Sequence, residues 1–370
     1  MNLNLFNIFK EDKVVAPPLK RIIEKILLGQ RINEDEGILL YQSADIGMLS
    51  FLADAANQSK NGHNVLHGQS LHIDLSNVCV YSCPFCTYCQ KLNDTSAFSL
   101  STKNLKELLQ TRGGDRNYSE VVISSASHPD HTLNYYKEVV ILVRKAFPRA
   151  FIRAFSATDL SYIFKKEKVS VYNGISQLKT AGINAVNSGG AEIFSNEIRE
   201  KISPEKITPE EWIDFHESLH NSGIRSNASM LYGHIESYKH RVDHMSRLRT
   251  LQDRTHGFLS FTSFKYKKEN NRLSSLGEAP LVEDLRNFAV ARIFLDNFQH
   301  HVAFAPKLKA SNLSLILSFG ISCIEGAVNQ GNKVYTQTLS ESKPYSIMVG
   351  EIILKSKKIP KERDGLYNVL

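Results

Sequence analysis

Short apolar runs alternate with amphipathic helical patterns from about residue 70 to residue 325. Strands are expected at 71–75, 120–124, 151–155, 183–186, 224–231, 258–264, 301–305 and 321–324. Helical spacing separates them, at 105–111, 134–147, 171–180, 238–255 and 281–296. This order predicts an α/β fold in which about eight parallel strands form a (β/α)8-type TIM barrel.

The barrel accounts for residues 66–325 and leaves a segment at each end. Residues 1–65 carry apolar side chains at helical spacing, which predicts an N-terminal helical extension. Residues 326–370 are expected to form a C-terminal tail packed on the barrel. The sequence therefore predicts one barrel domain with two flanking segments.

One helix start is explicit in the sequence. Thr208 is a suitable N-cap, Pro209 suits the first helical position, and Glu211 completes a capping box. We expect this helix to be scaffold, and its start fixes the phase of the strand–helix alternation around it.

Charge and hydropathy narrow the class of protein. The 370 residues carry a formal net charge of +7, but the basic residues are scattered, and the densest runs, 265–268 and 355–358, match no nucleic-acid module. No apolar run is long enough to span a bilayer, and residues 1–20 lack the pattern of a secretory signal. We therefore expect a cytoplasmic protein that binds neither nucleic acid nor membrane.

Four of the five cysteines lie within eleven residues, at Cys79, Cys83, Cys86 and Cys89. A crowded, odd set in a chain without a secretory signal argues against structural disulfides and for a metal or redox site. The set directly follows the first barrel strand. Loops after the strands of such barrels carry the chemistry, so the cysteines should lie on the active face.

The core spacing of this set is C-x3-C-x2-C, with Phe85 just before the third cysteine. Three thiolates on one loop can hold three corners of a [4Fe–4S] cluster and leave the fourth iron open for a ligand. A four-cysteine zinc site that recruits Cys89 is the alternative, although zinc sites usually pair two separated C-x2-C units. We interpret Cys89 as a spare thiol.

The three-cysteine spacing resembles that of the radical S-adenosylmethionine (SAM) superfamily, and the rest of the chain resembles the aminodeoxyfutalosine synthases within it. The matching strings are Ser188–Phe194, Asn227–Glu236, His240–His244, Leu251–Asp253, Pro306–Leu308 and Leu366–Leu370. The resemblance covers roughly residue 65 to the C-terminus.

The resemblance implies a reaction in menaquinone biosynthesis. A 5′-deoxyadenosyl radical, made from SAM at the cluster, would add to the enol-ether double bond of 3-[(1-carboxyvinyl)oxy]benzoate. Aryl migration and decarboxylation would give aminodeoxyfutalosine, methionine and bicarbonate. The implied partners are this carboxylated aromatic substrate and a one-electron donor of the flavodoxin or ferredoxin type.

The resemblance also implies cofactor contacts near the cysteines. Cys79, Cys83 and Cys86 would ligate the [4Fe–4S] cluster. Phe85 would pack beside the cluster and the adenine of SAM.

Further SAM contacts are expected after two later strands. Ser156 and Asp159 stand where ribose contacts are expected, because a carboxylate can accept from both ribose hydroxyls. Gly189 and Gly190 would let the backbone approach SAM closely. Glu192 would accept a hydrogen bond from the SAM ammonium, and the alternative is a charge that stabilises a helix N-terminus.

Histidines supply the catalytic candidates. His234 follows a predicted strand and would donate to a substrate carboxylate or take part in proton transfer. His128 follows the second predicted strand and would line the pocket. His240 and His244, four residues apart on one helix, are expected to be structural, because the glutamate of the H-E-x-x-H zinc motif is absent.

The chain also departs from the family pattern. Ser125 and Ala126 replace two glycines, and Cys323 and Glu325 replace two aspartates in the last barrel strand. These changes keep two alternatives open. One is a radical SAM enzyme with a different substrate, such as a dehypoxanthine futalosine cyclase. The other is a degenerate barrel that binds the cluster or SAM without turnover.

Overall fold

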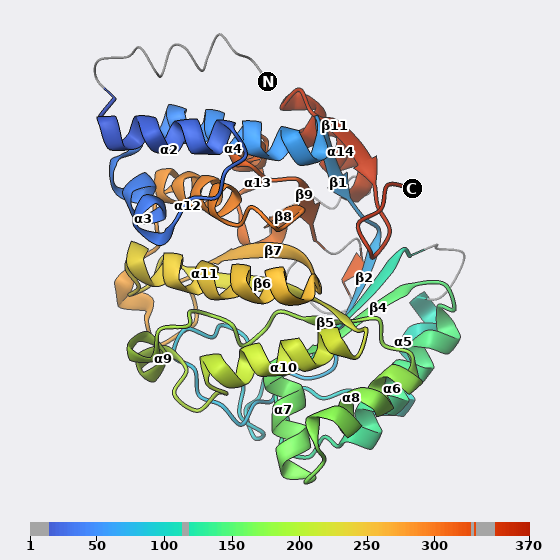
Figure 1. Ribbon diagram of the computed structural model, residues 1–370. Helices are drawn as coiled ribbons and strands as arrows, with labels where there is room; N and C mark the ends of the chain where they lie inside the picture. Colours follow the sequence, from blue (N-terminus) through green and yellow to red (C-terminus); the bar gives the residue numbers. More distant parts are fainter. Residues whose placement is uncertain (1–14, 113–117, 327–328, 331–344) are drawn as a thin grey trace.

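The fold is built on parallel strands wrapped by helices (Figure 1). The computed structural model describes residues 15–112, 118–326, 329–330 and 345–370. The main strands are β1 (Asn64–His67), β2 (Ser70–Asp74), β3 (Glu120–Ser124), β4 (Phe151–Ser156), β5 (Ala185–Asn187), β6 (Arg225–Tyr232), β7 (Phe258–Lys265), β8 (His300–Phe304) and β9 (Cys323–Glu325).

The parallel sheet closes into a barrel through the segment that contains β1 and β2. Strands β2 to β9 pair in chain order, and every pairing is parallel. β1 and β2 are separated by two residues, yet β1 pairs with β9, with Leu66 opposite Cys323, and β2 pairs with β3. Residues 64–74 therefore join both ends of the series. The predicted TIM-type α/β barrel is confirmed.

Helices alternate with these strands. They are α5 (Thr102–Arg112), α6 (Leu133–Ala146), α7 (Ala157–Lys166), α8 (Val171–Ala181), α9 (Asn196–Ile202), α10 (Pro209–Asn221), α11 (Tyr238–Thr255), α12 (Leu281–Phe294) and α13 (Ala310–Ile316). The predicted capping box opens α10, with the Thr208 side chain accepting from the Glu211 backbone N–H. Sequence analysis did not predict α7, α9 or α13.

The ends of the chain pack on this barrel. At the N-terminal end, α2 (Pro17–Leu27), α3 (Glu34–Ser43) and α4 (Ile46–Asn61) are helical as expected, and α4 packs on α12 (Figure 1). The expected helical segment reached residue 65, but β1 already begins at Asn64. Residues 1–14 lie outside the described part.

The C-terminal segment adds strands as well as a helix. It contains β10 (Asn329–Gln330), α14 (Tyr345–Lys355) and β11 (Ile359–Glu362). β11 runs parallel to β1, and β10 pairs with β2. The segment expected to be a tail thus extends the sheet on both sides of residues 64–74.

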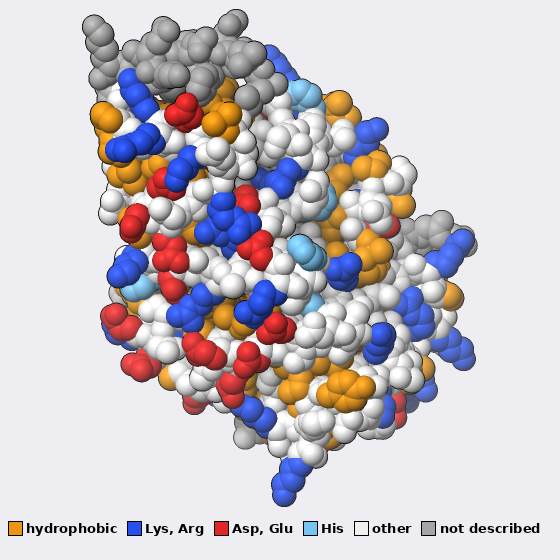
Figure 2. All heavy atoms as spheres, in the orientation of Figure 1, with side chains coloured by type: hydrophobic (Ala, Val, Ile, Leu, Met, Phe, Trp, Pro, Cys, Tyr) orange, Lys and Arg blue, Asp and Glu red, His pale blue; other side chains and the backbone are white. Residues whose placement is uncertain are grey.

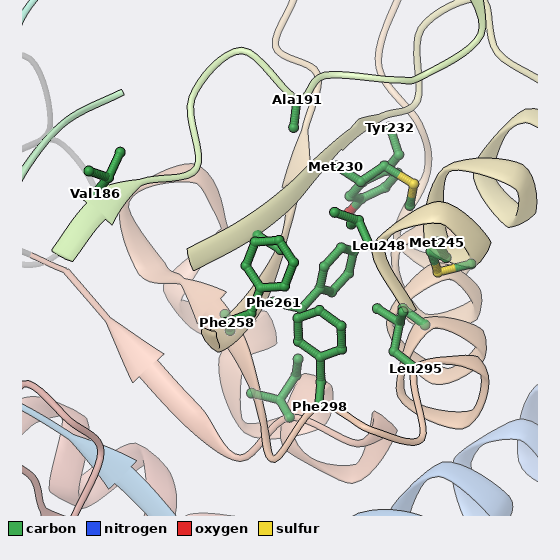
Figure 3. Close-up of a cluster of buried hydrophobic side chains, with 14 of the residues drawn as sticks. Val186, Ala191, Met230, Tyr232, Met245, Leu248, Phe258, Phe261, Leu295 and Phe298 are labelled. Atoms are coloured by element: carbon green, nitrogen blue, oxygen red, sulfur yellow. The ribbon is translucent and has the colours of Figure 1, made fainter. Parts of the chain in front are cut away.

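Apolar side chains fix the barrel wall against its helices. Figure 3 shows Phe258, Phe261 and Phe298 beside Leu248 and Leu295, between β6–β7 and the helices α11 and α12. Each of these side chains is no more than 5% exposed. This packing holds the strands in place, so the loops at their carboxyl ends start from fixed positions.

The surface carries mixed charge. Figure 2 shows blue and red side chains interspersed on the face that α10 and α11 cover. Within the described residues, the search for membrane-spanning helices finds none with the length and apolarity needed.

Candidate active site

A cavity of about 430 Å³ opens at the carboxyl ends of the barrel strands. Its wall includes the last residue of six strands, namely Ser124, Ser156, Asn187, Lys265, Phe304 and Glu325. Cys79, Cys86 and Cys89 from the loop after β2 also line it. Active sites of TIM barrels lie on this face. The cavity is therefore the candidate active site.

The cysteine loop is tied to its surroundings through backbone groups. The Cys79 N–H donates to the Gln90 carbonyl at 3.0 Å, and the Val80 N–H donates to the Ser127 carbonyl at 3.0 Å. Ser127 belongs to the loop after β3, which also lines the cavity. These bonds hold the start of the loop beside the neighbouring strand.

A lysine side chain gathers the same stretch of backbone. Lys91 Nζ donates to the carbonyls of Cys79, Val80 and Tyr81, at 3.1, 3.3 and 3.1 Å. Three carbonyl dipoles thus point at one ammonium group. Lys91 therefore fixes the backbone that presents the first cysteine.

Replacing Lys91 with methionine should weaken cluster retention about tenfold, the low end of what outer-shell partners of metal ligands contribute. The rate of iron loss to a chelator and the iron and sulfide content after reconstitution would measure this. Lys91→Arg should retain most of the cluster because it keeps the cation, and exposed Lys103→Met serves as the matched control. Equal rates of iron loss in wild type and Lys91→Met would contradict the assigned role.

Hydrogen bonds and burial shift the pKa values of the cysteine thiols. Cys86 Sγ accepts the backbone N–H groups of Tyr88 and Cys89, each at 3.4 Å. A side-chain hydrogen bond from Cys89 lowers the pKa of Cys86. Burial raises the pKa of the Cys83 thiol to about 11 and also raises the pKa of Cys79. Since metal ligands must be thiolates, iron binding has to displace the protons of these two cysteines.

The donor set fits an iron–sulfur cluster better than a single ion. Across the described ranges, no three His, Cys, Asp or Glu side chains converge on one point where an ion would bind. A zinc ion needs such convergence, whereas each cysteine of a cubane cluster binds a different iron. The N–H bonds to Cys86 Sγ are also of the kind that support cluster thiolates.

Ser156 and Asp159 form the N-terminal cap of α7 at the cavity wall. Asp159 Oδ2 accepts from the Ser156 hydroxyl at 2.7 Å, and Oδ1 accepts from the Ser127 hydroxyl at 2.9 Å. Burial raises the pKa of Asp159, and these hydrogen bonds oppose the rise. The carboxylate predicted to contact ribose is thus already held in place by two hydroxyl groups.

Gly189 and Gly190 bring the loop after β5 against this cap. Gly190 has a φ of 94°, and a Cβ there would lie 2.0 Å from Thr158 Oγ1. A Cβ on Gly189 would lie 3.0 Å from Ser156 Cβ. Both glycines line the cavity, and the positive φ and the close Thr158 hydroxyl favour glycine at position 190 independently of any ligand.

Glu192 is bound by a lysine that sequence analysis did not single out. Lys206 Nζ lies 2.7 Å from Glu192 Oε1, and Arg199 Nη1 lies 3.7 Å from Oε2. Burial alone would raise the pKa of Glu192, but the charges of Lys206 and Arg199 outweigh it and hold that pKa below its usual value. Lys206 Nζ also lies 5.4 Å from the centroid of the Phe85 ring, which lines the cavity.

The structure keeps both candidate histidines off the cavity wall. His234 Nδ1 lies 3.1 Å from Glu236 Oε2 and its Nε2 lies 3.1 Å from the Leu231 carbonyl oxygen, so both ring nitrogens face protein groups. His128 Nδ1 accepts from the Asp130 N–H, and its ring stacks on His131 at 4.1 Å. We assign neither histidine a catalytic role.

Two comparisons place the chain among known proteins. A family model described as "Radical SAM superfamily" matches residues 73–248. The chain is 32% identical to the aminodeoxyfutalosine synthase of Thermus thermophilus over 358 residues, which cover 95% of each chain.

The chain belongs to the radical SAM superfamily. It is a radical SAM enzyme related to aminodeoxyfutalosine synthase, and the predicted cofactors, a [4Fe–4S] cluster and SAM, are those of the family.

Other similarities are almost as strong. A 5-amino-6-(D-ribitylamino)uracil–L-tyrosine 4-hydroxyphenyl transferase of Methanoculleus marisnigri is 31% identical, with 89% of each chain covered. Among solved structures, methylornithine synthase has a TM-score of 0.72 at 14% identity, covering 92% of this chain and 97% of that one. The likeness to methylornithine synthase supports the barrel fold alone.

The cavity of this radical SAM enzyme also holds side chains that sequence analysis missed. They are Arg153, Lys206, Asn227, Ser229, Thr262, Lys265, Lys267 and Lys307. The sequence could have indicated some of these residues, because side chains two residues apart on one strand lie on the same face of the sheet. Polar residues at such spacing in an otherwise buried strand can therefore line a shared cavity. Asn227 and Ser229 on β6 follow this rule, whereas Lys206 and Lys307 lie on loops and short turns, where no such rule applies.

Proposed function

We propose that this enzyme joins the 5′-deoxyadenosyl group of SAM to 3-[(1-carboxyvinyl)oxy]benzoate and forms aminodeoxyfutalosine in menaquinone biosynthesis. The observation that carries the proposal is the end-to-end similarity to the Thermus thermophilus aminodeoxyfutalosine synthase, at 32% identity over 95% of each chain. A match of this extent runs along nearly the whole barrel and is not confined to the part that carries the cysteine motif.

The chain's own residues suit the binding of both reactants. Cys79, Cys83 and Cys86 would hold the cluster, which when bound supplies the electron that cleaves SAM to a 5′-deoxyadenosyl radical. A donor of the flavodoxin or ferredoxin type would deliver that electron. Asp159 would accept from the ribose hydroxyls, and Glu192 from the SAM ammonium. The cavity volume of about 430 Å³ falls in the range of small-molecule sites.

A related enzyme with another substrate is the second candidate. The 31% identity to the tyrosine 4-hydroxyphenyl transferase favours it, because this value hardly differs from the similarity to the synthase. Ser125 and Ala126 line the cavity and stand where the synthase pattern has glycines. A cyclase-like enzyme would abstract hydrogen and release 5′-deoxyadenosine, whereas a synthase retains the adenosyl group in its product.

The fate of the adenosyl group separates the candidates. We would reconstitute the cluster without oxygen, reduce it with dithionite, add SAM and 3-[(1-carboxyvinyl)oxy]benzoate, and identify products by mass spectrometry. Aminodeoxyfutalosine is the expected product. 5′-Deoxyadenosine alone would keep the radical chemistry and reject this substrate, and no product from an intact cluster would favour the degenerate barrel.

A further inference from the structure

The floor of the cavity is formed by side chains that point into the barrel below the strand ends. His72 on β2 stands opposite Val122 on β3, and Val122 stands opposite Arg153 on β4. All three residues line the cavity, and each lies two or three residues before the last residue of its strand. At a rise of about 3.3 Å per residue, they lie roughly 7–10 Å along the strands from the carboxyl ends. We name these three residues the cavity floor.

The charged groups at the cavity floor are already paired. Arg153 pairs with Glu120 and Glu325, and Arg363 pairs with the same two carboxylates. Two positive and two negative charges therefore hold one another. Recognition of a ligand at the floor needs a polar group that the protein leaves without a partner.

His72 is such a group. In the part of the chain that the structure describes, neither of its ring nitrogens forms a hydrogen bond or an ion pair, and the partly exposed side chain faces the cavity. Burial and the charge of Arg153 lower the pKa of His72 to about 4, so the ring is uncharged at neutral pH. An uncharged imidazole carries one N–H donor and one bare nitrogen that accepts. Both are left for a ligand in the cavity.

Other buried histidines of the barrel do not offer these groups to the cavity. Both ring nitrogens of His234 face Glu236 and the Leu231 carbonyl, as described above. His216 Nδ1 and His220 Nε2 lie 2.8 and 2.7 Å from the Ser226 hydroxyl. Among the described residues, His72 is the one histidine in the cavity wall.

The expected SAM contacts and the cavity floor lie at different depths. Ser156 is the last residue of β4, and it would contact SAM at the strand ends, together with the glycines of the loop after β5. The substrate has to lie within reach of the adenosyl group on the side away from the cluster. In this barrel that side is the floor, so the substrate would be held between SAM and the cavity floor.

The proposed reaction orients the substrate in this space. The 5′-deoxyadenosyl group would add to the enol-ether double bond of 3-[(1-carboxyvinyl)oxy]benzoate, so that double bond has to face SAM. The ring carboxylate is meta to the ether oxygen and therefore points away from SAM. A strong hydrogen-bond acceptor thus arrives at the level of the His72 ring.

We propose that His72 recognises the ring carboxylate of the substrate. The imidazole N–H donates to a carboxylate oxygen, and the aromatic ring of the substrate packs on the Val122 side chain, which stands beside His72 in the cavity floor. This inference rests on the proposed function for the identity of the ligand.

Two ligands that differ by one carboxylate test this contact. The holoenzyme, with its cluster oxidised and SAM present, would be titrated by calorimetry with 3-[(1-carboxyvinyl)oxy]benzoate and with 2-phenoxyacrylate, which lacks the ring carboxylate. Wild type should bind the benzoate about tenfold more tightly, the size expected for a hydrogen bond to a charged group. His72→Phe should lose this preference and leave the Kd of SAM unchanged. His72→Gln keeps an N–H donor and should restore part of the preference, and exposed His63→Phe is the matched control.

The ratio of the two affinities is insensitive to partial misfolding, because unfolded protein removes sites for both ligands alike. An unchanged ratio in His72→Phe, or a loss of SAM binding as large as the loss of benzoate binding, would overturn the role of His72. Absence of benzoate binding to wild type would overturn it as well. If the ratio depends on His72 but reduction of the wild-type complex yields no aminodeoxyfutalosine, the contact stands and the proposed function fails. Aminodeoxyfutalosine together with an unchanged ratio would have the opposite meaning.

Discussion

Replacing Cys83 with alanine should reduce bound iron to background and abolish all cleavage of SAM. A cubane cluster on three protein thiolates cannot lose one of them and keep an open fourth iron. Cys83 is 7% exposed, so its thiol is held in the interior of the loop. Iron and sulfide analysis, together with mass spectrometry of SAM-derived products, would measure the loss.

Cys323→Ala is the matched control for this prediction. Cys323 is fully buried on β9, far along the chain from the cysteine loop, and faces Arg363. This variant should keep its cluster and its SAM cleavage. A Cys83→Ala variant with wild-type iron content would refute the three-cysteine site, and loss of iron in Cys89→Ala as well would revive the four-cysteine alternative.

The second large effect concerns stability. Two arginines and two glutamates form a closed ring of alternating charge beside the cavity. Arg153 lies 2.9 Å from Glu120 and 3.2 Å from Glu325, and Arg363 lies 3.2 Å from Glu120 and 2.7 Å from Glu325. The Tyr367 hydroxyl donates to Glu325 in addition. The C-terminal segment thereby completes a network whose other members lie on barrel strands.

Arg363→Met should lower the free energy of unfolding by about 3–5 kcal/mol, because it leaves two buried carboxylates short of a partner. Urea unfolding followed by circular dichroism would measure the change. Exposed Lys361→Met, two residues earlier, should change stability by less than about 0.5 kcal/mol. Equal stabilities for Arg363→Met and wild type would show that the ring contributes nothing to folding.

The same ring predicts a pH dependence. Burial alone would raise the pKa of Glu325, but Arg153 and Arg363 outweigh it and hold that pKa at about 2, below the ordinary value of 4.5. Because the pKa of Glu325 is lower in the folded protein than in the unfolded chain, its ionisation stabilises the fold at pH values above about 4.5. This stabilisation is lost as the pH falls from about 4.5 toward 2. The stability gap between wild type and Arg363→Met should therefore narrow over that range.

Local patterns predicted the barrel because most residues of its strands are buried, which produces short apolar runs in the sequence. The strand predicted at 120–124 and the helix predicted at 238–255 coincide with β3 and α11. β1 was missed because it is four residues long and depends on pairing with β9 and β11, which lie far along the chain. Short-range periodicity carries no information on such contacts.

The candidate site likewise has a part that local sequence predicts and a part that depends on contacts between distant residues. The cysteine spacing alone identified the loop that lines the cavity, since its ligands are close in sequence. The charged ring could not be predicted, because Arg153 and Glu325 are 172 residues apart. His234 follows a strand as expected, but its ring is held by Glu236 and the Leu231 carbonyl, and only the folded geometry reveals that.

Electron paramagnetic resonance of the reduced protein, with and without SAM, tests the central claim most directly. The claim is that Cys79, Cys83 and Cys86 hold a [4Fe–4S] cluster whose open iron faces the cavity that binds SAM. We predict the signal of a reduced [4Fe–4S] cluster that changes when SAM is added. A protein that binds zinc and shows no such signal, or a cluster signal that SAM leaves unchanged, would contradict the account.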